Sequence, residues 1–158
     1  PKLVVHGASL RCSQGTNPTA LVVPAADQTL DQSHASATVM DFLPVVNIPP
    51  FGLCNSPANP QVASATAAAQ GVLTPQPCVP AIAGPWVPGA AQVHQLSKPL
   101  LTSNSTCNCT WAGTISVEAP ASDVDVNGAL GQVEHRRHAP RLAPAHGGDP
   151  RRPCESKF

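Results

Sequence analysis

The stretch STCNCTWAGTISV, residues 105–117, places two cysteines one residue apart, directly before an alternating segment. In that segment polar residues alternate with the apolar Ile115 and Val117, which is the pattern of a half-buried β-strand. Residues i and i+2 of a strand point to the same face, so Cys107 and Cys109 could present both thiols to one site. The stretch therefore predicts a strand preceded by a pair of thiols that share a face.

The chain before this strand predicts a mostly β fold made of short hairpins. The apolar runs KLVVHGASLRC, ALVVP and ATVMDFLPVVNIPPFGLC are each soon interrupted by glycine or proline. The chain contains 19 prolines, and a proline in a central strand removes a ladder hydrogen bond. We therefore expect short strands joined by rigid, Pro-rich connectors.

One short Ala-rich helix is predicted in NPQVASATAAAQG, residues 59–71. Asn59 is a good N-cap, Pro60 suits the first helical position, and Gly71 marks the end. Val62 would face one side of this helix. The small side chains of the interior would let its backbone lie close against a sheet.

The composition limits how well the chain can stabilise itself by burial alone. Hydrophobic residues make up 42% of the chain, but aromatic residues only 3%, so the apolar content is mostly Ala and Val. These side chains contribute less on burial than Leu or Phe. We expect additional stabilisation from a metal, a crosslink or a partner subunit.

The charge balance and the N-terminal residues give expectations about partners and location. The formal net charge is zero, and aromatic stacking platforms are scarce, so nucleic acid is not expected as a partner. No apolar run approaches the roughly 20 residues of a membrane span. PKLVVHGASLRCSQG does not have the pattern of a signal peptide. These features predict folding in the cytoplasm, where stable disulfides are uncommon.

The distribution of charge divides the chain into a compact domain, residues 1–122, and a polar tail, residues 123–158. Six of the basic residues lie in the tail, with His135, His138 and His146 among scattered prolines and glycines. The tail has no apolar periodicity that could offset the entropy of ordering it.

The chain contains six cysteines, which are Cys12, Cys54, Cys78, Cys107, Cys109 and Cys154. Their spacing leaves three hypotheses open. They could form a structural zinc site of four ligands, disulfides, or plain buried thiols. His6 lies close in sequence to Cys12 and could complete a site. His34 and His94 are expected to be structural or surface residues. Cys154, in the tail, is expected to be a free thiol.

Catalytic constellations are absent from the sequence. It contains no G-x-S-x-G, P-loop, H-E-x-x-H or G-x-G-x-x-G motif. Asp27, Asp31 and Asp41 are expected to be solvated turn residues. The chain is therefore expected not to be an enzyme.

Several stretches, taken in order, resemble the PAAR-like spike-tip proteins of contractile injection systems, such as type VI secretion systems and extracellular phage-tail-like particles. They are PKLVVHGASLRCSQGTNPTALVV, ATVMDFLPVVNIPPFGLCNSPANPQVASATAAAQGVLTPQPCVP, GPWVPG and CTWAGTISV. The resemblance covers residues 1 to about 120. It implies a small conical domain of short β-hairpins, one copy of which caps a trimeric β-helical spike of the VgrG type. A bound metal, usually zinc, holds the sharp end together in such proteins.

The resemblance also implies a set of metal ligands. PAAR-type sites mix histidines with a cysteine, whereas this chain has cysteines at the corresponding turns. We therefore expect a thiolate-rich zinc site of Cys12, Cys54, Cys78 and Cys109, with Cys107 and His6 as substitutes. Cys109 is preferred to Cys107 because the family motif centres on the cysteine two residues before the tryptophan.

The function implied is that of a non-enzymatic tip protein that sharpens the spike for membrane puncture. It would be assembled in the cytoplasm, sit at the tip of the particle, contact the target membrane transiently and be delivered on firing. One alternative is an adaptor whose tail attaches a toxin effector, and another is a free-standing zinc or disulfide module. Two alternatives stay open for Leu3, Val4, Val5, Ile115 and Val117: we expect them either to contact the spike or to form an internal core.

Overall fold

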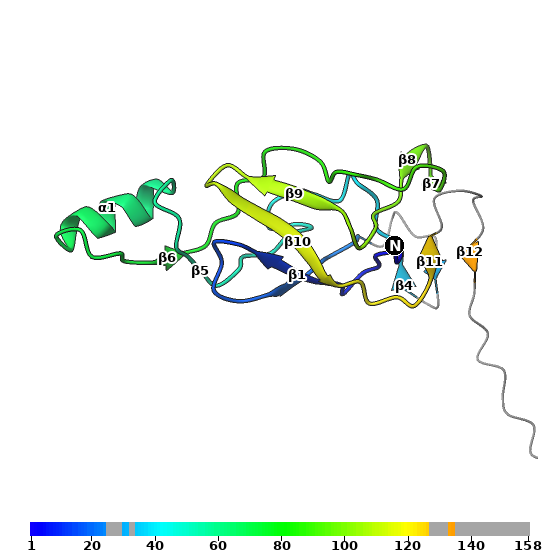
Figure 1. The fold of residues 1–158 in the computed structure, drawn as a ribbon, viewed down its shortest axis with the longest axis horizontal. Helices are drawn as coiled ribbons and strands as arrows, with labels where there is room; N and C mark the ends of the chain where they lie inside the picture. The colour runs from blue at the N-terminus through cyan, green and yellow to red at the C-terminus, as the bar shows by residue number, and fades with distance from the viewer. Residues whose placement is uncertain (25–29, 32–33, 127–132, 135–158) are drawn as a thin grey trace, which may run out of the picture.

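The computed structural model describes residues 1–24, 30–31, 34–126 and 133–134. Within these ranges the chain is mostly β, with short strands and one short helix. This confirms the predicted fold class. The described part is longer than it is wide, with helix α1 at one end and the N-terminus towards the other (Figure 1).

A four-stranded antiparallel sheet forms the middle of the molecule. Its order is β2 (Thr19–Ala20), β1 (Ser9–Cys12), β10 (Gly113–Ala119) and β9 (Thr106–Cys109). The first and last strands of the predicted domain, β1 and β10, are thus direct neighbours. The strand predicted from alternation is confirmed, since Ile115 is fully buried while Thr114 and Glu118 are exposed.

The remaining strands are two residues long and occur in antiparallel pairs. They are β3 (Leu30–Asp31) with β4 (His34–Ala35), β5 (Leu53–Cys54) with β6 (Gln76–Pro77), β7 (His94–Gln95) with β8 (Lys98–Pro99), and β11 (Asp125–Val126) with β12 (Val133–Glu134). Pairs this short agree with the frequent prolines, which prevent long ladders.

The hydrophobic core lies around the central sheet and is centred on a few large side chains. Trp86, Phe51 and Ile115 are among its fully buried members. Trp86 also satisfies its one polar group, because its Nε1 donates a hydrogen bond to the carbonyl oxygen of Asp41 at 3.0 Å. A smaller cluster packs at the end that carries the N-terminus, and it includes Leu3 and Val124.

The five residues that were expected to face either a spike or an internal core belong to the core. Leu3, Val4, Val5 and Ile115 are buried, and Val117 is partly buried against the main cluster. They are therefore not available as a docking surface. Buried packing continues beyond residue 122, because Val124 and Val126 are also buried.

Asp41 differs from its prediction as a solvated turn residue. It is only 5% exposed, and its carboxylate accepts hydrogen bonds from the backbone amide of Thr38 at 2.7 Å and from the hydroxyl of Thr38 at 3.0 Å. A buried carboxylate needs such donors, and they are supplied by the turn that brings residue 38 close to residue 41. Asp27 lies outside the described residues, and nothing is described of the Asp31 side chain.

Helix α1 (Pro60–Ala68) forms where the sequence predicts it. The side chain of Asn59 accepts a hydrogen bond from the Gln61 amide at 3.0 Å, which is an N-cap interaction. The helix ends at Ala68, and Gly71 follows with a φ of +89°. Val62, which was predicted to face one side of the helix, is its buried residue.

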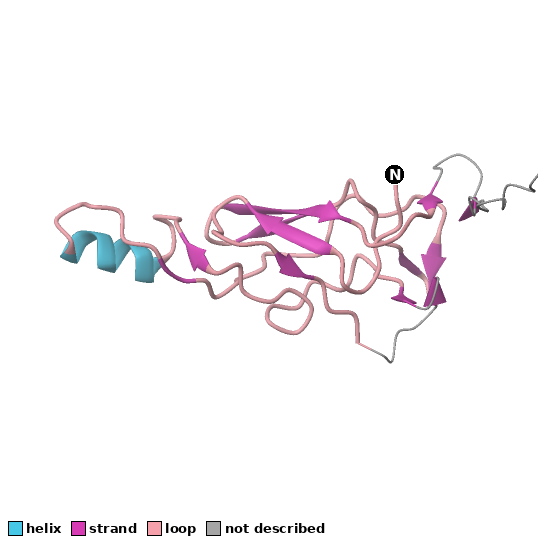
Figure 2. Cartoon of the chain, turned by 90° about the horizontal axis from the view of Figure 1, so that it is seen from below, coloured by secondary structure: helices cyan, strands magenta, loops and turns pink. Residues whose placement is uncertain are grey.

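The small side chains of this helix permit close packing against a sheet; the helix contacts β6, and its Val62 belongs to the main core cluster. The helix projects from one end of the molecule, on a segment that leaves through β5 and returns through β6 (Figures 1 and 2). We call residues 55–75 the arm. Small side chains permit such packing but do not require it. The position of the helix is set by the β5–β6 pair, where the two ends of the arm join the body and which we call its feet. In the described part of the chain, no helix is long and apolar enough to cross a membrane.

Candidate functional site

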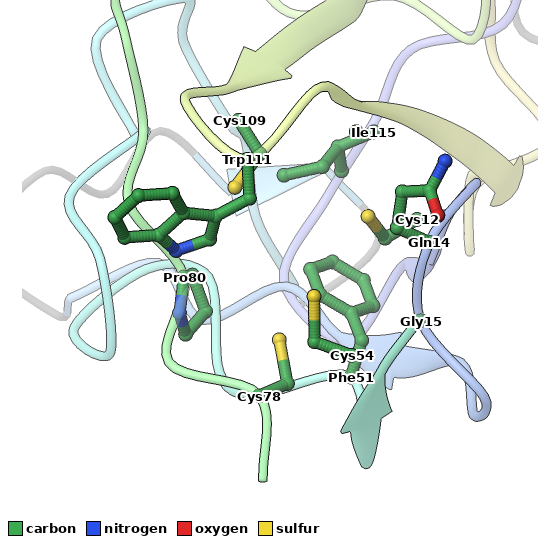
Figure 3. A pocket seen from close by; sticks show the side chains of 11 residues that line it. Cys12, Gln14, Gly15, Phe51, Cys54, Cys78, Pro80, Cys109, Trp111 and Ile115 are labelled. Atoms are coloured by element: carbon green, nitrogen blue, oxygen red, sulfur yellow. The ribbon is translucent and has the colours of Figure 1, made fainter. Parts of the chain in front are cut away.

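Four cysteines from distant parts of the sequence line one cavity at the base of the arm. They are Cys12, Cys54, Cys78 and Cys109, the four predicted metal ligands. Figure 3 shows their side chains arranged around the same space. The cavity volume is about 10 Å³, which is roughly the room that a single water molecule needs.

Strand register brings two of these cysteines to the same face of the central sheet. Cys12 ends β1 opposite Ile115 of β10, and Ile115 is in turn opposite Cys107 of β9. Cys109, two residues further along β9, is opposite Gly113. Directly opposed side chains in an antiparallel pair lie on one face, so the sheet presents Cys12 and Cys109 together.

The other two cysteines mark the feet of the arm. Cys54 ends β5 on the way out, and Cys78 follows β6 on the way back. The turn after Cys12 holds the outgoing foot, since the amide of Asn55 donates to the carbonyl of Gln14 at 2.9 Å. The amide of Cys78 donates to the carbonyl of Gly52 at 2.8 Å, which holds the returning foot. The cavity therefore lies where the arm joins the sheet.

Apolar side chains complete the wall of the cavity. Phe51, Pro80, Trp111 and Ile115 line it with the four thiols (Figure 3). Trp111 is fixed in place by its Nε1, which donates to the carbonyl of Val79 at 3.1 Å. Its own carbonyl accepts a hydrogen bond from the hydroxyl of Ser56 at the start of the arm. Apart from the four thiols and Gln14, the side chains that line the cavity are thus apolar.

Burial governs the protonation of several thiols. It raises the pKa of Cys12 and of Cys78, and neighbouring cysteines of the cavity raise both further, while backbone hydrogen bonds lower them. Burial, followed by the proximity of Cys109 and Cys12, raises the pKa of Cys107 to about 12. These three thiols are therefore protonated at neutral pH unless a cation replaces the proton.

The two substitute ligands lie elsewhere. Cys107 is buried in the main core and does not line the cavity. His6 is exposed, and its Nδ1 accepts a hydrogen bond from the amide of Val23 at 3.1 Å, which gives it a structural role. His34 and His94 are exposed as well. Cys154 lies outside the described residues.

The donor chemistry fits a structural zinc ion, since four thiolates form a closed tetrahedral set. All five cysteines of the described residues are free thiols. Within those same ranges, no three His, Cys, Asp or Glu side chains are already arranged to hold a metal ion. A zinc ion would have to draw the four sulfur atoms in to about 2.3 Å. Each thiol would lose its proton in doing so.

Gly113 and Phe51 are among the cavity residues that the sequence analysis did not single out. Gly113 lies on β10 between the two sheet cysteines, and a Cβ atom added to it would lie 2.8 Å from the sulfur of Cys12 and 3.6 Å from the Cβ of Cys109. Phe51 also lines the cavity and is 1% exposed. A glycine within a predicted strand is a signal for close approach of another group, and it could have indicated Gly113.

Fold and site together define a small, mostly β domain that gathers four thiols from separate segments into one apolar cavity. A family model described as a domain of unknown function, DUF4280, matches residues 4–121. The chain belongs to this family. No curated protein and no solved structure matches the chain closely enough to be compared with it.

Proposed function

We propose that this chain is a non-enzymatic tip protein that caps the trimeric, VgrG-like central spike of a contractile injection system. The proposal starts from the four stretches of sequence that resemble PAAR-like proteins. One structural observation supports it most directly: the four cysteines that the resemblance selected, from positions 12 to 109, line a single cavity.

In this proposal the thiols of Cys12, Cys54, Cys78 and Cys109 hold a structural zinc ion. The ion would supply a crosslink between the sheet and both feet of the arm, and folding free energy with it. A chain with 3% aromatic residues has few large side chains to bury. A crosslink at the base of a projecting segment would keep that segment from detaching under load.

The end opposite the arm would then face the spike. That end carries the N-terminus, the β7–β8 pair and β11 (Figure 1). It also carries the ion pair of Lys2 with Asp123 at 3.2 Å and the smaller apolar cluster. The five apolar residues first considered for spike contact are core residues, so the contact would be made by exposed groups of this end.

Co-expression with the trimeric spike protein from the same gene neighbourhood tests the proposal. Native mass spectrometry of the purified complex should find one copy of this chain for each spike trimer. A chain truncated after Glu134, which keeps the β11–β12 pair, should bind equally well, because the packed domain would make the contact. Failure of the full chain to bind would overturn the proposal. Loss of cargo delivery on this truncation, with spike binding and particle firing intact, would favour the adaptor function instead.

Elemental analysis and a thiol count on the purified chain test the zinc ion separately. We expect one zinc per chain, with all cysteines titratable after the metal is removed under denaturing conditions. Disulfides without zinc would contradict the metal site and leave spike binding to be judged by the first experiment.

A further inference from the structure

A long middle section of the chain avoids charge completely. Residues 42–97, about a third of the sequence, contain no Asp, Glu, Lys or Arg. At the chain's own charged share of 11%, about six charged residues would be expected in a stretch of this length. The whole arm and both of its feet fall within this section.

Large apolar side chains are exposed in the same section. Of the exposed large apolar side chains in the described residues, all but Met40 belong to it. Two of them follow α1 on the arm, where Val72 is 68% exposed and Leu73 is 51% exposed. Two more, Leu53 and Val79, lie at its feet. The projecting end of the molecule is therefore both uncharged and partly apolar.

The helix itself has no distinct polar face. Its exposed positions are Pro, Gln, Ala and Ser, and Val62 is its buried residue. A helix that docks in a protein groove presents one apolar face to the groove and a polar face to water. The exposed side of this helix carries no charged side chain that would oppose contact with lipid.

The size of the arm agrees with partial entry into a bilayer. Nine helical residues extend about 14 Å, whereas the hydrocarbon core is about 30 Å thick. Charged side chains strongly oppose such entry, and the arm has none. Both ion pairs among the described residues, Lys2–Asp123 and Arg11–Glu118, belong to other parts of the fold.

We infer that the arm, residues 55–75, is the part of this protein that enters a lipid bilayer. The inference deepens the proposed function, because it names the element that would meet the target membrane. Entry would be driven by the apolar residues after the helix and permitted by the absence of charge, so it would not depend on anionic lipids. The cysteine cavity would hold the feet of the arm while the arm is in lipid.

A tryptophan reporter on the arm tests this inference with the full chain and no spike. Leu73→Trp is mixed with phosphatidylcholine vesicles whose acyl chains carry bromine, and its fluorescence is compared with that of the parent protein. We expect bromine to quench the added tryptophan at least twofold more than in Leu96→Trp. Leu96 is a fair control, because it is 76% exposed and lies between β7 and β8, near the opposite end.

Charged side chains placed on the arm provide the second part of the test. Ala63 and Ala67 are exposed helical positions, and Lys and Gln are both good helix formers. Adding Ala63→Lys and Ala67→Lys to Leu73→Trp should abolish the quenching, whereas Ala63→Gln with Ala67→Gln should preserve it. Equal quenching of the Leu73 and Leu96 reporters, absence of quenching at Leu73, or quenching that survives both lysines would overturn the inference.

Spike binding by the same variants separates this inference from the proposed function. The double lysine variant should still bind one copy per spike trimer, because its substitutions lie on the arm. A parent protein that binds the spike but shows no contact with lipid would refute this inference alone. Lipid contact by a parent protein that never binds a spike would refute the proposed function alone.

Discussion

Gly113 has no side chain, and the sulfur of Cys12 lies in the space that a side chain there would need. A Cβ atom on Gly113 would lie 2.8 Å from that sulfur, closer than two such atoms can approach without one of them moving. The glycine is on β10, opposite Cys109, so its missing side chain allows two thiols to reach the same cavity.

Gly113→Ala should weaken zinc binding with little effect on the fold. The Cys12 side chain can rotate away from the new methyl group, but rotation removes its sulfur from the cavity. We expect zinc affinity to fall about tenfold or more, as for other changes that misplace a ligand. The melting temperature of the metal-free protein should stay close to that of the parent. Gly84→Ala is the matched control, because nothing lies within 4 Å of a Cβ added there. Unchanged affinity in Gly113→Ala would argue against Cys12 as a ligand.

Cys109→Ala should remove the zinc ion, whereas Cys107→Ala should leave the zinc content unchanged. The two cysteines are neighbours on β9, but only Cys109 lines the cavity. Elemental analysis should find that Cys109→Ala loses its zinc, while Cys107→Ala retains one zinc per chain. Cys107→Ala should lower stability by about 1 kcal/mol through lost core packing. If Cys107→Ala lost zinc and Cys109→Ala kept it, the ligand assignment would be wrong.

The metal-free protein should lose stability as the pH rises above about 9. The pKa of Cys107 is raised from an ordinary value of 9.0 to about 12 by burial, and the pKa values of Cys12 and Cys78 are raised too. The unfolded chain then releases thiol protons at a lower pH than the folded chain does. Stability is therefore full below about pH 9 and falls towards about pH 12, by up to about 1.4 kcal/mol per pH unit for each such thiol.

Urea unfolding from about pH 8 to about pH 11, with a chelator and a reductant present, would measure this decline. Thiolate absorbance offers a second measurement, which no tyrosine obscures because the chain has none. Cys107→Ala should show a shallower decline than the parent. A stability that stays level across this range in the parent would contradict the assignment of these thiols as buried and protonated.

Asn59→Ala should increase local unfolding of helix α1 without unfolding the domain. The substitution removes the N-cap bond to Gln61 and should destabilise α1 by about 1 kcal/mol. Because α1 projects from the body, the effect should be confined to the arm. Amide exchange over residues 61–68 should accelerate about fivefold, with the central sheet unchanged. Asn59→Ser restores a capping oxygen and should exchange nearly as the parent does. Acceleration in β1 and β10 as well would show that the arm and the sheet unfold together.

The parts of the fold that sequence could predict are those with local causes. Alternation alone indicates the strand that contains Ile115, and Asn59 followed by Pro60 indicates where α1 begins. The position of the arm had no local cause, because an Ala-rich surface suits either contact or exposure. The burial of Asp41 depends on the turn that supplies the donors of Thr38, and a short acidic side chain in a turn usually faces water.

The candidate site could be predicted only in part for a similar reason. The spacing of the cysteines left zinc, disulfide and inert thiols open, and the choice of four came from resemblance to a family. Their meeting depends on strand register, which sets Cys12 and Cys109 on one face. It also depends on the β5–β6 pair, which brings Cys54 and Cys78 alongside. No short window of sequence contains that information.

The β5–β6 pair has a practical consequence. Leu53 is opposite Pro77 and Cys54 is opposite Gln76, so the two ends of the arm already meet before anything is built between them. The entropy of closing a loop changes only slowly with its length. Residues 57–75 should therefore behave as an exchangeable cassette, into which a tight turn, a longer hairpin or a foreign peptide can be grafted. The graft would lose the core packing of Val62 but keep the hydrogen bonds of Asn55 and Ser56 to the body.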